Sequence, residues 1–310
     1  MTRRVVAVVG PTATGKSALG VALAHAFDGE VVACDSTAVY RGIDIGTDKV
    51  PPAEQQGIAH HLVDVVDPGE TYSAARYAAD AAATIRAIAG RGRLPVLAGG
   101  TGFYYRALVR GLFPGPARDA ALRDRLDRVA AARGVEALHR WLERVDPESA
   151  RRIQPRDQKR LVRALEVYLT TGRPLTDYFA QTASPIGEFQ VLPIGVTLPR
   201  AVLRERVARR VEEQFARGVV AEVDRLLAGG VPETAHALTG LVYRQVLEMR
   251  RGVRGEPETR ALIVQENMRY ARRQLMWFRK EAGVHWIDGP GEGLAARERA
   301  IGIVREFMMI

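Results

Sequence analysis

Hydrophobic residues in the first 113 positions form blocks of two kinds. Some are short runs of β-branched and other apolar residues, as expected of strands buried on both faces of a parallel sheet. The others are longer stretches rich in alanine and leucine, which favour helices. The predicted strands are Val5–Val9, Val31–Cys34 and Leu94–Ala98, and the predicted helices are Ser17–Phe27 and Ala74–Ile88. This alternation predicts an α/β fold, a parallel sheet flanked by helices.

The pattern changes at Pro114-Gly115-Pro116, which interrupts regular structure. From there to about Gln181 the apolar positions follow a helical period, as in Leu122, Leu126 and Val129. Later elements are expected at Val191–Leu198 (strand), Arg200–Ala228 and Glu258–Glu281 (helices) and His285–Ile287 (strand), before a terminal helix. We therefore expect a helical insertion domain at 115–188 within an α/β core formed by 1–114 and 189–310.

A glycine-rich loop follows the first predicted strand. Residues 10–17 are GPTATGKS, which matches the phosphate-binding pattern G-x-x-x-x-G-K-[ST] of P-loop proteins. Backbone N–H groups and the helix dipole favour an anion there, Lys16 adds a positive charge, and the Ser17 hydroxyl can bind Mg²⁺. The predicted phosphate site comprises Gly10, Pro11, Thr12, Ala13, Thr14, Gly15, Lys16 and Ser17. The loop alone does not identify the phosphorylated ligand.

Two further polar segments follow predicted strands. Asp35-Ser36 comes after the second strand, and Gly99–Gly102 comes after the third. Because ligands of parallel α/β sheets bind at the carboxyl ends of the strands, we expect these segments and the glycine loop to meet in one cleft.

Composition narrows the class of protein. The chain has 310 residues, of which 47% are hydrophobic, as in a globular protein, and no apolar run is long enough to span a bilayer. The residues before the first strand leave no room for a signal peptide. Cys34 is the only cysteine, so no intrachain disulfide can form, and we expect a cytoplasmic protein. We expect no obligatory protein partner.

Positive charge is concentrated in two segments. The chain has 45 Lys and Arg against 36 Asp and Glu, a net charge of +9. Residues 151–173 and 269–280 are especially basic, and the second segment includes Trp277 and Phe278. Arginines with interleaved aromatic residues are typical of RNA-binding surfaces. The alternative is a solvated helix face with aromatic residues in the core, and the sequence leaves it open for Trp277 and Phe278.

At Asp35 the chain also resembles a known family, the tRNA dimethylallyltransferases, or tRNA isopentenyltransferases, of bacterial type. The matching segments, in order, are Gly10–Ser17, Asp35–Lys49 (DSTAVYRGIDIGTDK), His60–Pro68, Tyr72–Tyr77, Leu94–Leu112, Arg156–Leu175 and Tyr270–Lys280. They cover nearly the whole chain, and the Gly-Gly-Thr and Arg-Leu-x-Arg-Ala-Leu-Glu segments are specific.

The resemblance implies a reaction. A dimethylallyl group passes from dimethylallyl diphosphate to the exocyclic N6 amine of the adenosine 3′-adjacent to the tRNA anticodon, with Mg²⁺ as cofactor and pyrophosphate as product. By resemblance, Asp35 is the base for the amine and Arg210 grips the diphosphate. The Thr101 hydroxyl, at the end of a predicted strand, is expected to donate to the bridging oxygen. Lys16 suits the task of stabilising the leaving anion.

The resemblance also implies tRNA contacts. Matching positions are Asp35, Ser36, Thr37, Ala38, Thr101, Arg123, Lys159, Arg160, Leu161, Val162 and Arg163. For Arg123 the alternative is an exposed arginine beside Asp124 and Asp127. The chain departs from the family pattern at Val242, Met276 and Arg156, where the family usually has Gly, Thr and Asn, which affects details of tRNA docking.

Two other functions fit part of the sequence. A P-loop kinase of small molecules or nucleotides would need an acidic residue after a strand, but Gly99-Gly100 follows the third strand. A non-catalytic RNA-binding protein would not need an intact Lys16 and Asp35. His60-His61 lacks a partner Cys or His at ligand spacing, so a packing or hydrogen-bonding role is expected rather than a metal site.

Overall fold

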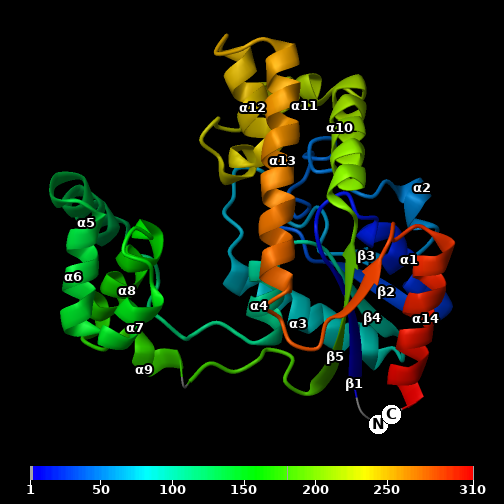
Figure 1. The fold of residues 1–310 in the computed structure, drawn as a ribbon, viewed down its shortest axis with the longest axis horizontal. Helices are drawn as coiled ribbons and strands as arrows, with labels where there is room; N and C mark the ends of the chain where they lie inside the picture. The colour runs from blue at the N-terminus through cyan, green and yellow to red at the C-terminus, as the bar shows by residue number, and fades with distance from the viewer. Residues whose placement is uncertain (1–2, 180, 310) are drawn as a thin grey trace. The chain divides into compact units, whose positions relative to one another are not determined.

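A parallel sheet of six strands lies at the centre of the larger part of the protein (Figure 1). The structure is a computed structural model that describes residues 3–179 and 181–309. The strand order is β3-β2-β4-β1-β5-β6, and neighbouring strands are parallel. The strands are β1 (Arg3–Val9), β2 (Gly29–Ala33), β3 (His60–His61), β4 (Leu94–Ala98), β5 (Phe189–Thr197) and β6 (His285–Asp288). Since β2, β4 and β1 are neighbours, the loops after them start side by side.

The chain divides into two compact units. The first comprises Met1–Val109 and Pro185–Ile310, and the second comprises Arg110–Ser184. The second unit contains α5 (Ala120–Arg133), α6 (Val135–Val145), α7 (Pro147–Arg152), α8 (Gln158–Thr171) and α9 (Leu175–Phe179). These helices enclose their own core, which includes Leu126, Leu142 and Leu165. The unit begins and ends slightly before the expected bounds of 115–188.

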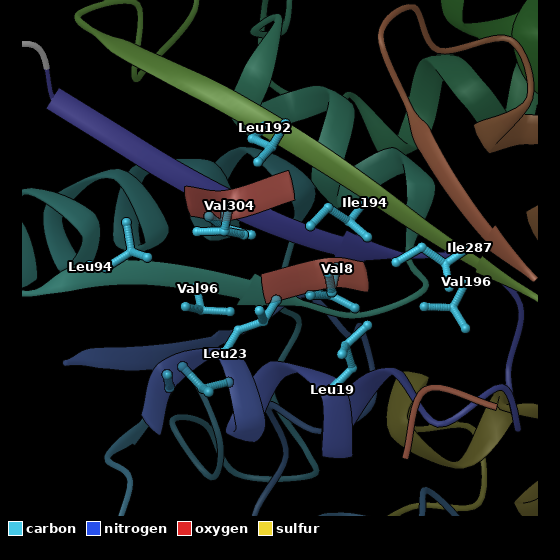
Figure 2. Close-up of a cluster of buried hydrophobic side chains, with 14 of the residues drawn as sticks. Val8, Leu19, Leu23, Leu94, Val96, Leu192, Ile194, Val196, Ile287 and Val304 are labelled. Atoms are coloured by element: carbon cyan, nitrogen blue, oxygen red, sulfur yellow. The ribbon is translucent and has the colours of Figure 1, made fainter. Parts of the chain in front are cut away.

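Helices cover both faces of the sheet. The first unit contains α1 (Lys16–Ala26), α2 (Pro52–Gln55), α3 (Ala74–Gly90), α4 (Gly102–Val109), α10 (Arg200–Ala216), α11 (Val219–Ala228), the 3₁₀ helix η1 (His236–Thr239), α12 (Leu241–Arg250), α13 (Glu256–Phe278) and α14 (Leu294–Met309). On one face, Leu19 and Leu23 of α1 and Val304 of α14 pack against the sheet (Figure 2). Helix α3 packs against β1, β2 and β4.

Alternation along β1 explains why both faces need cover. Val6 and Val8 belong to the cluster beneath α1 and α14, whereas Val5, Ala7 and Val9 are equally buried but point to the opposite face. Full burial of one such valine stabilises the fold by about 2 kcal/mol. A continuous apolar run is therefore what a strand in this position requires.

The five predicted strands are confirmed as β1, β2, β4, β5 and β6. The prediction of one helix over Arg200–Ala228 is wrong, because α10 ends at Ala216 and α11 begins at Val219. Gly218 between them has φ +88°, a left-handed conformation that ends a helix. The sequence pattern also missed β3 and α12. Among the described residues, no helix is long and apolar enough to cross a membrane.

Candidate active site

The glycine loop after β1 is folded tightly around its own backbone. Gly10 has φ +134° and lies so close to Val196 that a Cβ would overlap the Val196 carbonyl oxygen. Thr14 Oγ1 donates to Pro11 O at 2.9 Å, and Lys16 Nζ donates to the same oxygen at 2.5 Å. Helix α1 then begins at Lys16, with Gly15 as its N-cap. The N–H groups at such a helix start are suited to bind an anion.

Lys16 has an altered acidity in this loop. Burial and, to a smaller extent, the positive charge of Arg210 lower the pKa of its ammonium to about 7, although the negative charge of Asp35 partly opposes the shift. A bound anion would supply the missing negative charge. An anionic ligand would therefore favour the charged form of Lys16.

Asp35 is fixed in the loop after β2. Its Oδ1 accepts hydrogen bonds from Thr37 N at 2.8 Å, Thr37 Oγ1 at 2.6 Å and Ala38 N at 3.4 Å. Within the described residues no hydrogen bond is made to Oδ2. One oxygen thus orients the carboxylate, and the other is available to a substrate proton.

Backbone bonds connect the Asp35 loop to the loop after β4. Thr101 N donates to Cys34 O at 3.1 Å, and Ser36 N donates to Thr101 Oγ1 at 3.1 Å. A Cβ on Gly99 would overlap the Cys34 backbone, so glycine is required for this approach. The Thr101 hydroxyl therefore lies beside Ser36, at the edge of the site.

A buried glutamine on α13 joins the third loop to the first. Gln274 Oε1 accepts from Thr12 N at 2.8 Å, and its Nε2 donates to Gly100 O at 2.9 Å. One turn earlier on the same helix face is Tyr270, whose pKa is raised to about 12 by burial and by the negative charge of Asp35. The sequence pattern placed Tyr270 only among the aromatic residues of a basic segment and did not single out Gln274, although two polar side chains four positions apart on a packed face were a usable signal.

Two arginines of α10 reach the glycine loop. Arg210 Nη1 donates to Thr12 Oγ1 at 2.6 Å, and Arg210 Nε pairs with Asp48. Arg206 Nε donates to Ala13 O at 2.8 Å. Arg209 instead pairs with Glu213 at 3.5 Å and is mostly exposed. Arg210 is thus positioned to bind a ligand of the loop, and Arg206, which also lines the first cavity, pairs with Glu292 at 2.6 Å.

The loops enclose two adjoining cavities. The first, of about 460 Å³, is lined by the loop residues Thr12, Ala13, Gly15, Lys16 and Ser17, and by Asp35, Ala38, Gly99 and Gly100. The second, of about 230 Å³, is lined by residues that include Ser36, Thr37, Val207, Val242 and Asn267. Thr12, Asp35, Thr47, Asp48, Arg210 and Tyr270 line both. The predicted convergence of three loops is therefore confirmed.

Comparison with known proteins gives the family. The family model described as IPP transferase matches residues 38–281. The chain is 46% identical to a tRNA dimethylallyltransferase of Thermomicrobium roseum, over 97% of this chain and 92% of that protein. It is 45% identical to one of Solibacter usitatus, over 98% of each.

The chain belongs to the IPP transferase family.

Solved structures agree. The full-length tRNA isopentenylpyrophosphate transferase of Bacillus halodurans is 35% identical, with a TM-score of 0.72 and coverage of 99% of this chain and 96% of that one. A eukaryotic dimethylallyltransferase, solved while acting on tRNA, is 25% identical, with a TM-score of 0.80 and coverage of 99% and 80%. The resemblance, the P-loop α/β fold and the prediction of a transferase are confirmed.

Some of the residues predicted to bind the diphosphate or to act in catalysis line the two cavities, and others do not. Gly10, Pro11 and Thr14 shape the loop but do not line the first cavity, unlike the other five loop residues. Thr101 lines neither cavity, although its hydroxyl is fixed at their edge by Ser36. The roles of these residues remain predictions.

The predicted tRNA contacts of the insertion fall into two groups. Lys159 and Arg160 are exposed on α8. The side chains of Leu161 and Val162 are buried in the core of the insertion, so a contact from these side chains is corrected to a packing role. Their apolar character already fitted the buried face of an amphipathic helix.

Arg123 and Arg163 are part of a buried ion-pair network. Arg123 donates through Nε and Nη2 to Glu166, both at 2.8 Å, and Arg163 Nη1 donates to the same carboxylate at 2.5 Å. Burial opposes the charge of Glu166, yet these bonds and one from Asp119 N lower its pKa to about 2. Arg123 is therefore neither a free surface cation nor paired with Asp124 or Asp127, and we assign both arginines a structural role.

Phe278 and the two histidines have packing and hydrogen-bonding roles. The Phe278 ring is fully buried and lies edge-on to Tyr105 at 5.7 Å. His61 Nε2 lies 2.6 Å from Glu30 Oε2, and His60 Nδ1 lies 2.9 Å from Ile58 O. Within residues 3–179 and 181–309, no group of three or more acidic, His or Cys side chains could hold a metal ion.

The Glu166 network predicts acid sensitivity of the insertion. Glu166 has a pKa of about 2 here against 4.5 when unperturbed, so its contribution is fully present above pH 4.5 and is lost as the pH falls toward 2. The loss is at most about 3 kcal/mol. Urea unfolding of the full chain at several pH values measures it. The free energy of unfolding of Glu166→Gln should differ less from that of wild type as the pH falls. A difference that stays constant with pH would contradict the assignment.

The lowered pKa of Lys16 predicts pH-dependent anion binding. A bound pyrophosphate raises this pKa. The affinity of the protein for pyrophosphate is therefore highest below about pH 7, where Lys16 is charged, and declines above it. The decline is at most about tenfold per pH unit. Lys16→Arg is the control because its guanidinium stays charged. Calorimetric titration from pH 6 to 9 should show the affinity ratio of wild type to Lys16→Arg falling, and a constant ratio would refute the shift.

Proposed function

We propose that this protein transfers a dimethylallyl group from dimethylallyl diphosphate to the N6 amine of the adenosine 3′-adjacent to the tRNA anticodon, releasing pyrophosphate. One observation supports it best. The phosphate loop and the Asp35 carboxylate line the same cavity, so an anionic leaving group and a proton acceptor can be present at one substrate. Family membership and the names of the relatives support the same reaction.

The phosphate side of the site suits a leaving diphosphate. When the carbon–oxygen bond breaks, both electrons stay on oxygen, and the negative charge on the diphosphate grows. Lys16, the N–H groups at the start of α1 and Arg210 are aimed at this region before the reaction begins. Fixed donors of this kind stabilise the transition state more than the ground state.

We include Mg²⁺ as a cofactor. Ser17 lies at the start of α1, is exposed and lines the first cavity, so its hydroxyl is a suitable ligand. Mg²⁺ prefers oxygen ligands and commonly binds through substrate phosphates, so it does not need a cluster of protein carboxylates. When bound, the ion would offset charge on the diphosphate. The protein's own contribution is the donor set around it.

The acceptor side of the site suits an amine. An adenosine N6 must lose a proton as it bonds to carbon, and the unbonded Oδ2 of Asp35 can accept it. Thr37 and Ala38 keep the carboxylate oriented meanwhile. Asp35, Ser36 and Thr37 line the second cavity, so we place the acceptor base there. The base must leave the RNA stack to enter.

We also propose that the exposed face of α8 contacts tRNA phosphates. Lys159 and Arg160 are exposed on this face, and Arg160 pairs with the partly exposed Asp157 at 3.2 Å, whereas Arg163 is held by the buried Glu166. A cytoplasmic location remains a prediction based on the single cysteine.

Substitution of Asp35 separates catalysis from binding. Asp35→Ala should lower kcat by about 100-fold or more while tRNA affinity changes little, because the base acts only as the bond forms. The assay combines the protein, Mg²⁺, labelled dimethylallyl diphosphate and bacterial tRNA, followed by nucleoside mass analysis. Asp67→Ala, an exposed carboxylate that lines neither cavity, is the control.

Three outcomes distinguish the candidate functions. Label on adenosine that is abolished only in Asp35→Ala supports the proposal. Phosphoryl transfer from ATP to a small acceptor, with no label on tRNA, would identify a kinase. Tight tRNA binding without either reaction would identify a non-catalytic RNA-binding protein.

Salt dependence tests the tRNA surface. Arg160→Ala should weaken tRNA binding and reduce the slope of log affinity against log salt by about one, because one phosphate contact is lost. Arg299→Ala, at an exposed position of α14, should leave the slope unchanged. Filter binding from about 50 to 200 mM salt measures both slopes. Equal slopes for wild type and Arg160→Ala would remove Arg160 from the interface.

A further inference from the structure

The two cavities share a wall in which one carboxylate fixes the catalytic arginine. Asp48 and Arg210 line both cavities. Asp48 Oδ2 pairs with Arg210 Nε and accepts from Gln214 Nε2 at 2.5 Å. The far end of the guanidinium, at Nη1, donates to Thr12 Oγ1 in the phosphate loop at 2.6 Å. The guanidinium is thus held from behind by Asp48 and faces the loop.

A second carboxylate fixes the loop that carries Asp48. Glu222 of α11 is 1% exposed, and its Oε2 accepts from Asp44 N at 2.9 Å and Ile45 N at 2.8 Å. Its Oε1 accepts from Gly46 N at 3.2 Å and from Tyr243 Oη at 2.6 Å. A buried carboxylate that accepts four hydrogen bonds is costly to displace, so the loop has little freedom.

The charges explain why Arg210 needs this support. Arg210 and Lys16 repel each other, as the lowered pKa of Lys16 shows. Burial raises the pKa of Asp48, and the neighbouring Arg210 counteracts that rise. Without a carboxylate behind it, a guanidinium on a long flexible side chain would move away from a second cation. Asp48 compensates the charge of Arg210 from the wall that the two cavities share.

We propose that Asp48 is a positioning residue: it holds the Arg210 guanidinium at the junction of the two cavities, so that Arg210 meets the diphosphate of the substrate in a fixed orientation. This inference rests on the proposed function for its role in turnover, but not for its role in binding pyrophosphate. Glu222 of α11 and Tyr243 of α12 keep the Asp48 loop in place.

A double-mutant cycle tests whether Asp48 acts through Arg210. The affinity of the full chain for inorganic pyrophosphate with Mg²⁺ is measured by calorimetry for wild type, Asp48→Asn, Arg210→Gln and the double variant. Each single change should weaken binding by about tenfold, and the double variant should lie within about twofold of Arg210→Gln. The proposal would be overturned if the double variant lost affinity by the product of the two single losses. It would also be overturned if Asp48→Asn bound pyrophosphate like wild type.

Turnover supplies a readout that a merely structural role would not give. Asp48→Asn should lower kcat/KM for dimethylallyl diphosphate by about tenfold or more, and the KM for tRNA should stay within about twofold. Arg217→Ala is the control, because Arg217 is half exposed and lies 3.6 Å from Asp48 without reaching the loop. Arg217→Ala should keep near-wild-type kinetics. A matching rise in the KM for tRNA in Asp48→Asn would indicate general loosening and overturn the proposal.

The two proposals can fail separately. If wild type binds pyrophosphate but transfers no dimethylallyl group to tRNA, the proposed function fails, while the cycle still decides the positioning role. If wild type is active and the losses multiply, only the positioning role fails.

Discussion

The close approach of three loops at one edge of the sheet is the constraint on which the site depends. Gly99 lies against the backbone of Cys34, and Gly10 lies against that of Val196. At both places a single added carbon would overlap backbone atoms, which cannot move without moving a strand. Gly99 thus joins the loops after β2 and β4, and Gly10 holds the loop after β1 against β5. Gln274 connects the loops after β1 and β4 by one hydrogen bond to each. Lys16 and Asp35 share a cavity for this reason.

Arginine has two different tasks in this protein. In the insertion, Arg123 and Arg163 neutralise the buried Glu166 and keep α5 and α8 together. In the first unit, Arg210 is itself neutralised in part by Asp48 and directs its remaining donors to the phosphate loop. The net charge of the protein does not distinguish these two tasks. The position of the nearest carboxylate decides which arginines keep donors for a phosphate.

The sequence was informative wherever function requires contiguous residues. Residues 10–17 predicted the phosphate loop and its helix, and runs of buried valines predicted the main strands, because period and composition are local properties. Gln274, Asp48 and Glu222 were missed, because each acts on a loop far away in the chain. The same limit explains Leu161, because α8 was taken as one basic surface although its two sides have different surroundings. It also explains Arg123 on α5, whose partner Glu166 lies on another helix.

A structure with substrates bound tests the central claim, that one edge of the sheet brings the diphosphate and the base together. The measurement is a crystal structure of the protein with Mg²⁺, a thio analogue of dimethylallyl diphosphate that resists cleavage, and tRNA. Our account predicts the diphosphate in the first cavity within hydrogen-bond distance of Lys16 Nζ, with the adenosine amine beside Asp35 Oδ2. A diphosphate bound away from the glycine loop, or an amine remote from Asp35, would contradict it.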